Sequence, residues 1–319
     1  MSIEYYRIAN VILAINQDQV FLPKKLKYAF QPFIADSLRE DDRVLNVSIT
    51  KNKVEEPSQL KPCYLENVSG FYTRFGTTSL PTNSKIVDQS PDDNQMSCCY
   101  YSRSVSSNEA VCARLFLSSD QAVIDVCADY KNESNYCQLI SMALWAVFGT
   151  WALKHHRLFL HSSVTVVGEK AILFLGESGI GKSTQSSLWQ KYIPGSWLLN
   201  DDSPMIYVDP NKCTAHGEAD FLVYGTPWSG KTSCFHSLGA PIGCVVRISR
   251  GSINKVTSLT PANAFAALQP SVPPMFNCDE KLTDFVCTIL SDLITEVDCN
   301  HLVCTPTKEA VICLQQKML

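Results

Sequence analysis

Several features that would place a protein in a specialised class are missing from this sequence. It has 14 cysteines in 319 residues, but they are scattered and form no Cys-x-x-Cys pair. Structural zinc sites usually draw their ligands from such pairs, so a zinc module has no support. The net charge of −4 gives no excess of basic residues, which argues against a general nucleic-acid-binding protein. The sequence also contains no internal repeat.

No apolar run reaches the roughly 20 residues that a membrane-spanning helix needs. The most apolar segment, Leu139 to Leu153, is shorter and is followed by basic residues. We therefore expect a buried helix, or a helix at a domain junction, and no membrane association. The N-terminus carries acidic and aromatic residues in place of the basic segment and apolar core of a secretory signal. This predicts a cytoplasmic protein whose cysteines are mostly reduced and buried, with a disulfide framework as the alternative.

The composition, 45% hydrophobic and 18% charged residues, is that of a folded globular protein, and the length suits two domains. We expect a smaller strand-rich domain over residues 1–135, a connecting apolar helix over 136–157, and a mixed-sheet α/β domain over 158–319. The strands expected in the first domain are 5–13, 43–50, 70–74, 97–103, 110–118 and 122–128. A polar surface loop is expected over 77–94.

The second domain begins with three closely spaced strand patterns, 158–161, 163–167 and 171–175, and a hairpin turn at 168–170 joins the last two. A simple βαβ unit would place a helix between such strands. The other expected strands are 197–199, 205–208, 221–224 and 242–249. The expected helices are 183–192, 261–268, 279–294 and 308–315.

Directly after the strand at 171–175 comes Gly-Glu-Ser-Gly-Ile-Gly-Lys-Ser, a complete phosphate-binding P-loop. Glycines let the backbone turn tightly and point its N–H groups inward, the lysine adds a positive charge, and the serine offers an oxygen to Mg²⁺. The alternative is a glycine-rich turn with an exposed lysine. The predicted cofactors are ATP and Mg²⁺, and the predicted binding residues are Gly176, Glu177, Ser178, Gly179, Ile180, Gly181, Lys182, Ser183 and Thr184.

Two adjacent carboxylates, Asp201 and Asp202, follow Asn200 at the end of the strand pattern 197–199. Phosphoryl transfer needs one carboxylate to hold Mg²⁺ and another to accept the proton of the attacking hydroxyl. A solvated turn is the alternative for such a pair. Behind a P-loop, we favour the functional interpretation.

Other residues are candidates from their positions alone. His161 ends the strand before the hairpin, and it could bind phosphate, orient an aspartate or be a structural imidazole. Arg247 and Arg250 could neutralise a transferred phosphate or lie at the surface. The turn Gly-Thr-Pro-Trp-Ser-Gly-Lys could face a substrate or pack its tryptophan into the core. Its candidate substrate contacts are Thr226, Trp228, Ser229 and Lys231.

Taken in this order, His161, the hairpin, the P-loop and the aspartate pair resemble the HPr kinase/phosphorylase family. More widely, the chain is similar to the phosphoenolpyruvate-carboxykinase-like nucleotide fold and to stand-alone serine kinases of peptide-modification gene clusters. The resemblance covers residues 158–314. It implies that Asp201 is the general base, that Lys182 binds phosphate, and that Ser183 and Asp202 bind the metal.

One departure from the family pattern narrows the range of expected phosphoryl acceptors. HPr kinases carry a Glu-Ile-Arg-Gly signature after the aspartate pair, whereas the corresponding stretch here is Val223-Tyr-Gly-Thr226. The resemblance therefore favours the stand-alone kinase branch over an enzyme that acts on HPr and reverses the reaction. Because HPr kinases form hexamers, a homo-oligomer is a further implication.

The expected function is an ATP-dependent kinase that phosphorylates a hydroxyl, namely that of a serine in a peptide or small protein. The first domain would bind the substrate or a partner. One alternative is a nucleotide-dependent binding or regulatory module with little transfer activity. Another is a kinase or carboxykinase-like enzyme acting on a small metabolite.

Overall fold

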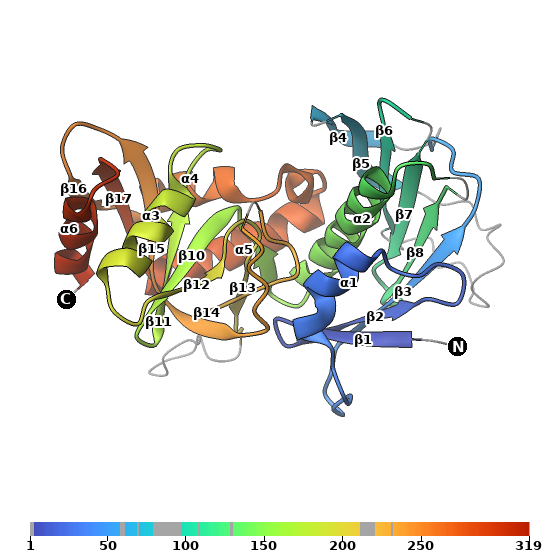
Figure 1. Cartoon of the computed structure of the whole chain (residues 1–319), viewed down its shortest axis with the longest axis horizontal. Helices are drawn as coiled ribbons and strands as arrows, with labels where there is room; N and C mark the ends of the chain where they lie inside the picture. Colours follow the sequence, from blue (N-terminus) through green and yellow to red (C-terminus); the bar gives the residue numbers. More distant parts are fainter. Residues whose placement is uncertain are drawn as a thin grey trace. The chain divides into compact units, whose positions relative to one another are not determined.

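The computed structural model describes residues 3–57, 61–68, 70–78, 97–107, 109–127, 130–210, 221–230 and 232–318. The protein is a mixed α/β protein with two β-sheets, one of them curled into a half-barrel, which confirms the predicted α/β class (Figure 1). The chain forms two compact units, Met1–Trp151 with Asn277–Leu282, and Ala152–Phe276 with Thr283–Leu319. The boundary between Trp151 and Ala152 lies within the segment 136–157, which the sequence predicts to be a connecting helix.

The first unit contains an eight-stranded sheet. Its strands lie in the order β1 (Ile3–Ile8), β2 (Val11–Asn16), β3 (Val44–Lys51), β8 (Gln121–Val126), β7 (Ala110–Phe116), β6 (Ser97–Ser104), β5 (Phe71–Thr78) and β4 (Lys61–Val68). Neighbours are antiparallel except for the parallel pairs β2 with β3 and β3 with β8. The predicted strand-rich character of this region is confirmed.

Three local predictions in this unit need correction. The single strand expected over 5–13 is a hairpin, because Ala9 and Asn10 turn the chain with φ angles of 50° and 60°. Neither β4 nor the helix α1 (Lys24–Phe30) was predicted. Residues 77 and 78 of the expected loop belong to β5, and residues 79–94 lie outside the described part of the chain.

The predicted apolar helix is α2 (Glu133–Leu153). It is the one helix in the described residues that is long and apolar enough to cross a membrane, and 72% of its apolar window is buried. Leu144 and Phe148 are fully buried, and the indole nitrogen of Trp151 donates a hydrogen bond of 2.7 Å to Asp120. This burial is typical of the core helix of a folded protein.

The second unit contains a nine-stranded sheet. Its main path is β12 (Trp197–Asn200), β10 (Ser162–Val167), β11 (Lys170–Leu175), β15 (Gly239–Arg250), β14 (Phe221–Tyr224), β13 (Met205–Val208) and β9 (Arg157–Phe159). Off this path, β17 (Asp298–Cys304) pairs with β15 and with β16 (Lys255–Ser258). The predicted hairpin is confirmed, since β10 and β11 are antiparallel and Gly168 turns with a φ of 60°.

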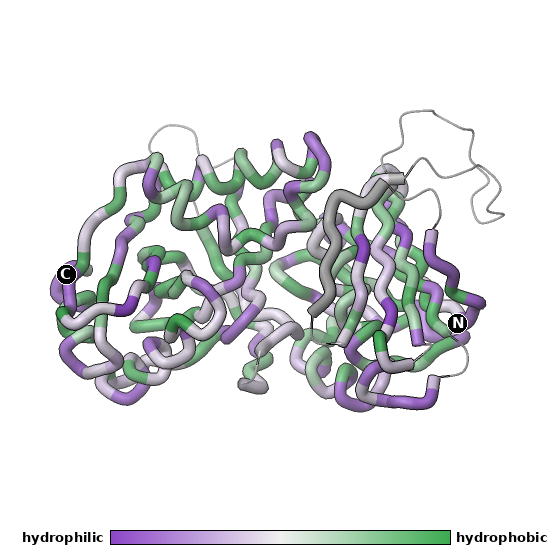
Figure 2. Tube along the Cα trace, turned by 90° about the horizontal axis from the view of Figure 1, so that it is seen from above, coloured by the Kyte–Doolittle hydropathy of each residue, from purple (hydrophilic) through white to green (hydrophobic). Residues whose placement is uncertain are grey.

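The helices of the second unit are α3 (Lys182–Tyr192), α4 (Pro261–Leu268), α5 (Glu280–Glu296) and α6 (Lys308–Met318). All four were predicted, and α4 has the predicted bounds because Thr260 caps it and proline occupies its first position. Phe174 of β11, Trp189 of α3 and Val311 of α6 share one buried cluster. Hydrophobic residues recur along the strands and helices, as the colouring of Figure 2 shows.

One edge of this sheet collects the ends of several strands. Strand β10 is antiparallel to both β11 and β12, so those two strands run in the same direction. Strands β15 and β17 are parallel to β11 and to each other. The carboxyl ends of β12, β11, β15 and β17 therefore lie at one edge, which is where open α/β sheets bind ligands.

Candidate functional site

The P-loop connects the carboxyl end of β11 to the first turn of α3, as the sequence predicts. Its three glycines, Gly176, Gly179 and Gly181, have φ angles of 150°, 77° and 124°, which other residues rarely adopt. A Cβ atom at Gly176 would lie 2.7 Å from Cγ2 of Ile180, so the loop is also too tight for a side chain there. The N–H groups at the start of α3 face outward from the helix and suit an anion.

Lys182 is held in place within this loop. Its ammonium group donates to the carbonyl oxygens of Gly176 at 2.9 Å and Glu177 at 3.3 Å, and it lies 3.0 Å from Nε2 of His161. These three partners match its three hydrogens. Burial lowers the pKa of Lys182, against the opposing influence of the two nearby aspartates. Lys182 is thus a largely buried cation whose hydrogens are held by protein groups.

His161 links the lysine to the aspartate pair. Because the Lys182 ammonium has only hydrogens to donate, Nε2 of His161 accepts and Nδ1 carries the ring hydrogen. That Nδ1 lies 3.3 Å from Oδ1 of Asp202. The backbone N–H of His161 donates to Ser271 at 2.7 Å, which fixes the chain just before β10. The structure therefore brings together three predicted site residues from separate segments.

Asp201 is the buried member of the carboxylate pair, with a relative exposure of 8%. The Ser163 hydroxyl donates to its Oδ1 at 2.7 Å, and the Thr232 hydroxyl donates to its Oδ2 at 2.9 Å. Ser163 also lies 2.6 Å from the hydroxyl of Ser186 in α3. These two donors, one on each carboxylate oxygen, fix the orientation of the Asp201 side chain.

Asn200 organises the turn that carries both aspartates. Its side-chain oxygen accepts from the backbone N–H groups of Asp202 and Ser203, each at 3.0 Å. Its amide nitrogen donates to the carbonyl of Trp228 at 3.2 Å. Asparagine and aspartate commonly build such turns after strands. Asn200 is fully buried and Asp201 is 8% exposed, whereas the Asp202 side chain is 40% exposed.

The Gly-Thr-Pro-Trp segment braces this turn. The buried hydroxyl of Thr226 donates to Ser203 at 2.7 Å, and Trp228 packs edge-on against Phe159 with ring centres 5.5 Å apart. The Ser229 hydroxyl donates to the carbonyl of Thr232 at 2.6 Å. These contacts are structural, so Thr226 and Trp228 support the site from within. Lys231 lies outside the described residues.

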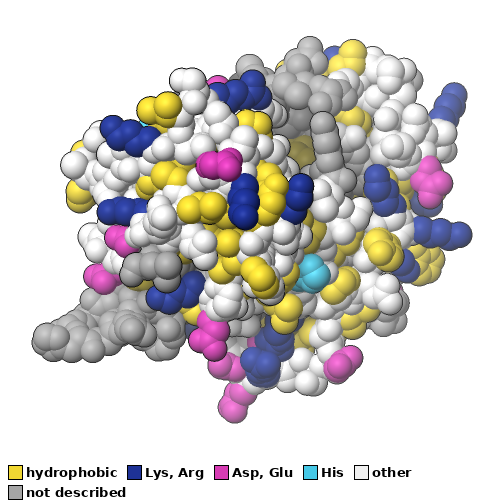
Figure 3. Space-filling view, turned by 60° about the vertical axis from the view of Figure 1, so that its left-hand side comes forward, with side chains coloured by type: hydrophobic (Ala, Val, Ile, Leu, Met, Phe, Trp, Pro, Cys, Tyr) yellow, Lys and Arg dark blue, Asp and Glu magenta, His cyan; other side chains and the backbone are white. Residues whose placement is uncertain are grey.

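The two arginines of β15 contact the P-loop at different points. Arg250 donates to the carbonyl oxygens of Gly179 and Ile180, so it holds the loop backbone. Arg247 lies 3.9 Å from a carboxylate oxygen of Glu177 and donates to the carbonyl of Ala267 at 3.5 Å. Both therefore lie beside the predicted phosphate site. On the face shown in Figure 3, Lys and Arg side chains lie at separate places among hydrophobic ones.

Two of the residues at this edge suit a magnesium ion, which prefers oxygen ligands and keeps several waters. Ser183 is exposed at the start of α3, and the Asp202 side chain is 40% exposed. Within the described part of the chain, no group of three or more His, Cys, Asp or Glu residues could hold a metal alone. A metal here would therefore depend on phosphate oxygens and water for its other ligands.

Sequence reasoning missed two residues of the site, Ser163 and Thr232, and the bracing role of Asn200. Ser163 follows His161 closely, and its position at the start of a buried strand was the available signal. Thr232 is brought to Asp201 from 31 positions away. Neither the protein-family models nor the curated proteins include a match to this sequence.

Proposed function

We propose that the second unit is an ATP-dependent kinase domain that transfers the γ-phosphate to a hydroxyl, namely that of a serine in a peptide or small protein. The observation that carries this proposal is the chain of contacts from Lys182 through His161 to Asp202, at 3.0 Å and 3.3 Å. It connects a P-loop lysine to a carboxylate pair at the same sheet edge. Binding of a Mg²⁺-nucleotide would use one of those carboxylates, and transfer uses the second as the proton acceptor.

The resemblance to HPr kinases and the phosphoenolpyruvate-carboxykinase-like fold supports the same proposal. Its elements are found in the expected order here: the histidine, the antiparallel hairpin, the P-loop and the aspartates after β12. The stretch Val223-Tyr-Gly-Thr226 lacks the acidic and basic residues of the HPr kinase signature. Thr226 instead supports the aspartate turn. This favours an acceptor other than HPr.

In the proposed reaction, Lys182 leaves its carbonyl partners and binds the β- and γ-phosphates together with the loop N–H groups. Asp201 accepts the proton of the acceptor hydroxyl, held in orientation by Ser163 and Thr232. Ser183 and Asp202 would hold the magnesium ion, which neutralises phosphate charge when bound. Arg247 adds a positive charge beside Glu177. Catalysis is then mainly positioning and charge stabilisation.

One observation favours a second candidate, a nucleotide-dependent binding module with little transfer activity. Asp201 is only 8% exposed, and both of its oxygens already accept hydrogen bonds. A carboxylate oxygen can accept more than one bond, so a hydroxyl can still reach it. If the acceptor cannot approach, the site would bind nucleotide and signal its presence to the rest of the protein.

One experiment separates the two candidates. The whole protein is incubated with Mg²⁺-ATP and a library of serine-containing peptides, and the products are identified by intact mass. Kinase activity predicts a gain of one phosphoryl group on a peptide, absent for Lys182→Ala and Asp201→Asn. Tight ATP binding without any phosphorylated peptide favours the binding module. Absence of ATP binding in the wild-type protein contradicts both.

A further inference from the structure

The sheet order gives the phosphate site two distinct sides. Strand β11, which leads into the P-loop, has β10 and β12 on one side and β15 and β17 on the other. His161, Asp201 and Asp202 all come from the side of β10 and β12. Because Lys182 reaches toward them and a P-loop lysine binds the β- and γ-phosphates, the terminal phosphate belongs on that side. The nucleoside of the bound nucleotide must then extend in the other direction, over the carboxyl ends of β15 and β17.

A pocket of about 380 Å³ lies in that direction. It is formed by the P-loop, the first turns of α3 and the carboxyl ends of β15 and β17. This volume falls in the range of roughly 300–1,000 Å³ that is common for small-molecule sites. Gln185 of α3 and Arg250 of β15 are among the residues that line it.

Gln185 gives this pocket a specific recognition group. Its side chain is 2% exposed, and its amide nitrogen donates to Sγ of Cys304 at 3.2 Å. Its carboxamide oxygen is buried and has no hydrogen-bond partner among the residues that the structure describes. Buried polar atoms are rarely left in this state, so the oxygen marks a place for a ligand's donor. With its second amide hydrogen, Gln185 can pair with the N6 amino group and N7 of adenine.

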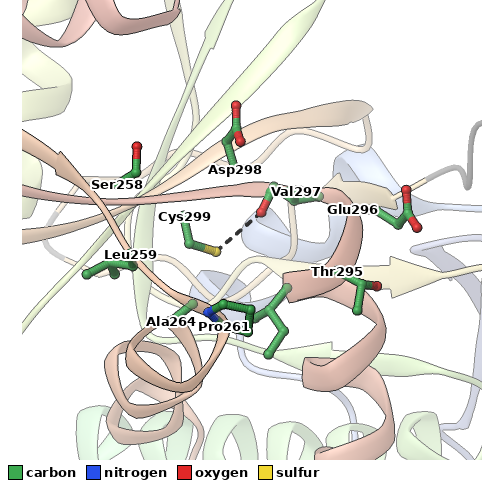
Figure 4. Close-up of a pocket in the computed structure, with 10 residues that line it drawn as sticks. Ser258, Leu259, Pro261, Ala264, Thr295, Glu296, Val297, Asp298 and Cys299 are labelled. Atoms are coloured by element: carbon green, nitrogen blue, oxygen red, sulfur yellow. Dashed lines mark hydrogen bonds between the residues drawn. The ribbon is translucent and has the colours of Figure 1, made fainter.

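The charge of the pocket agrees with a nucleotide. Arg250 lies at the pocket and already contacts the loop carbonyls, so it places a positive charge beside the phosphate chain. None of the described residues that line the pocket is acidic. A smaller pocket of about 140 Å³ at the opposite sheet edge is lined by Glu296 and Asp298, which would repel phosphate. Figure 4 shows this second pocket, with Cys299 donating to the carbonyl of Val297.

We infer that the pocket between the P-loop and the carboxyl ends of β15 and β17 binds an adenine nucleoside, with Gln185 reading the edge of the base. The inference rests on the proposed nucleotide-binding function and adds to it the position and identity of the base. It requires that the affinity for ATP depend on Gln185, while the affinity for a phosphate chain without a nucleoside does not.

The test compares three ligands, Mg²⁺-ATP, Mg²⁺-GTP and Mg²⁺-tripolyphosphate, by calorimetry with the whole protein. In Gln185→Met, ATP affinity should fall about tenfold and the preference for ATP over GTP should largely disappear, because one base-specific pair is lost. Tripolyphosphate affinity should stay unchanged. Gln190→Met is the matched control, since Gln190 is on the same helix and its amide donates to the carbonyl of Ser186.

Failure of the proposed function and failure of the adenine-pocket inference give different results. If wild-type protein binds neither ATP nor tripolyphosphate, the proposed function fails and the inference fails with it. If both bind but Gln185→Met keeps wild-type ATP affinity and base preference, only the inference is overturned. Should Gln185→Met lose tripolyphosphate as well, photolabelling of wild-type protein with 8-azido-ATP decides. Labelled peptides covering 248–251 or 304–306 support the pocket, and labelling confined to other segments overturns it.

Discussion

The ammonium group of Lys182 and the imidazole of His161 are 3.0 Å apart, and the same imidazole is 3.3 Å from Asp202. The histidine therefore connects the residue expected to bind the transferred phosphate with one expected to bind the metal. Replacing it removes a positioning contact without removing a phosphate ligand. We expect His161→Ala to lower the transfer rate on the order of 10²-fold, with little change in ATP affinity. Rates from a peptide phosphorylation assay and affinities from calorimetry check this.

The control for that variant is His236→Asn. His236 packs edge-on against Trp197 with ring centres 5.4 Å apart, and it is not part of the chain of contacts from Lys182 through His161 to Asp202. It should retain the wild-type rate. An unchanged rate in His161→Ala would remove the histidine from the proposed site.

The two aspartates should respond differently to loss of charge. Asp201→Asn should bind ATP normally and lose transfer, because an amide cannot accept the hydroxyl proton. Asp202→Asn should instead raise the Mg²⁺ concentration needed for half-maximal rate, and added Mg²⁺ should recover part of the activity. Titrations of Mg²⁺ against rate separate the two effects. Wild-type transfer by Asp201→Asn would disprove the base assignment.

Two neighbouring serines allow a matched test of how Asp201 is positioned. The Ser163 hydroxyl donates to Asp201 at 2.7 Å, whereas the Ser162 hydroxyl lies 3.4 Å from the carbonyl of Leu160. Ser163→Ala should reduce the transfer rate and cost about 1–3 kcal/mol of stability, because a buried carboxylate loses a donor. Ser162→Ala should keep the wild-type rate. Equal rates for the two variants would show that the Ser163 contact has no catalytic importance.

Two glycines with a positive φ allow the P-loop to be tested separately from the hairpin that precedes it. Gly176→Ala combines a φ of 150° with a 2.7 Å approach to Ile180, so it should abolish ATP binding. Gly168→Ala, in the turn of the hairpin, has open space around it and should cost only about 1–2 kcal/mol. Thermal denaturation and ATP titration measure the two effects. ATP binding by Gly176→Ala at wild-type strength would contradict the tight loop.

The buried thiols predict how the protein responds to alkali. Burial raises the pKa of Cys244 from 9.0 to about 12, and that of Cys299 to about 11. The folded state therefore favours the protonated thiols. Their contribution to the free energy of unfolding is fully present below pH 9 and is lost as the pH rises toward the folded-state pKa values. At pH 8 the folded protein should leave both thiols unlabelled by iodoacetamide, while denatured protein labels them. Rapid labelling of Cys244 in the native state would contradict this burial.

The sequence predicted the parts of the site that are local in the chain. The P-loop, its preceding strand and α3 follow one another, and glycine spacing reports their geometry directly. The contact of Lys182 with His161 spans 21 positions, and that of Thr232 with Asp201 spans 31, so no local pattern reveals either. They depend on strand pairing that only the folded sheet supplies.

The missed elements of the fold have similar causes. Strand β17 contains Asp298, Asn300 and His301, which interrupt an apolar pattern, yet it is paired on both sides by β15 and β16. Its strand form comes from those neighbours rather than from residue preference. The turn at Ala9 and Asn10 was missed because it lacks glycine, although asparagine tolerates a positive φ.

Strand β11 has hydrogen-bonded neighbours along both of its sides, β10 and β15. Backbone groups in the middle of a sheet open rarely, and their amide hydrogens exchange with solvent slowly. The P-loop is thus anchored at one end to a strand that is expected to open only rarely. If the proposed transfer takes place, β11 can keep its pairing throughout, and only side chains such as Lys182 need to move.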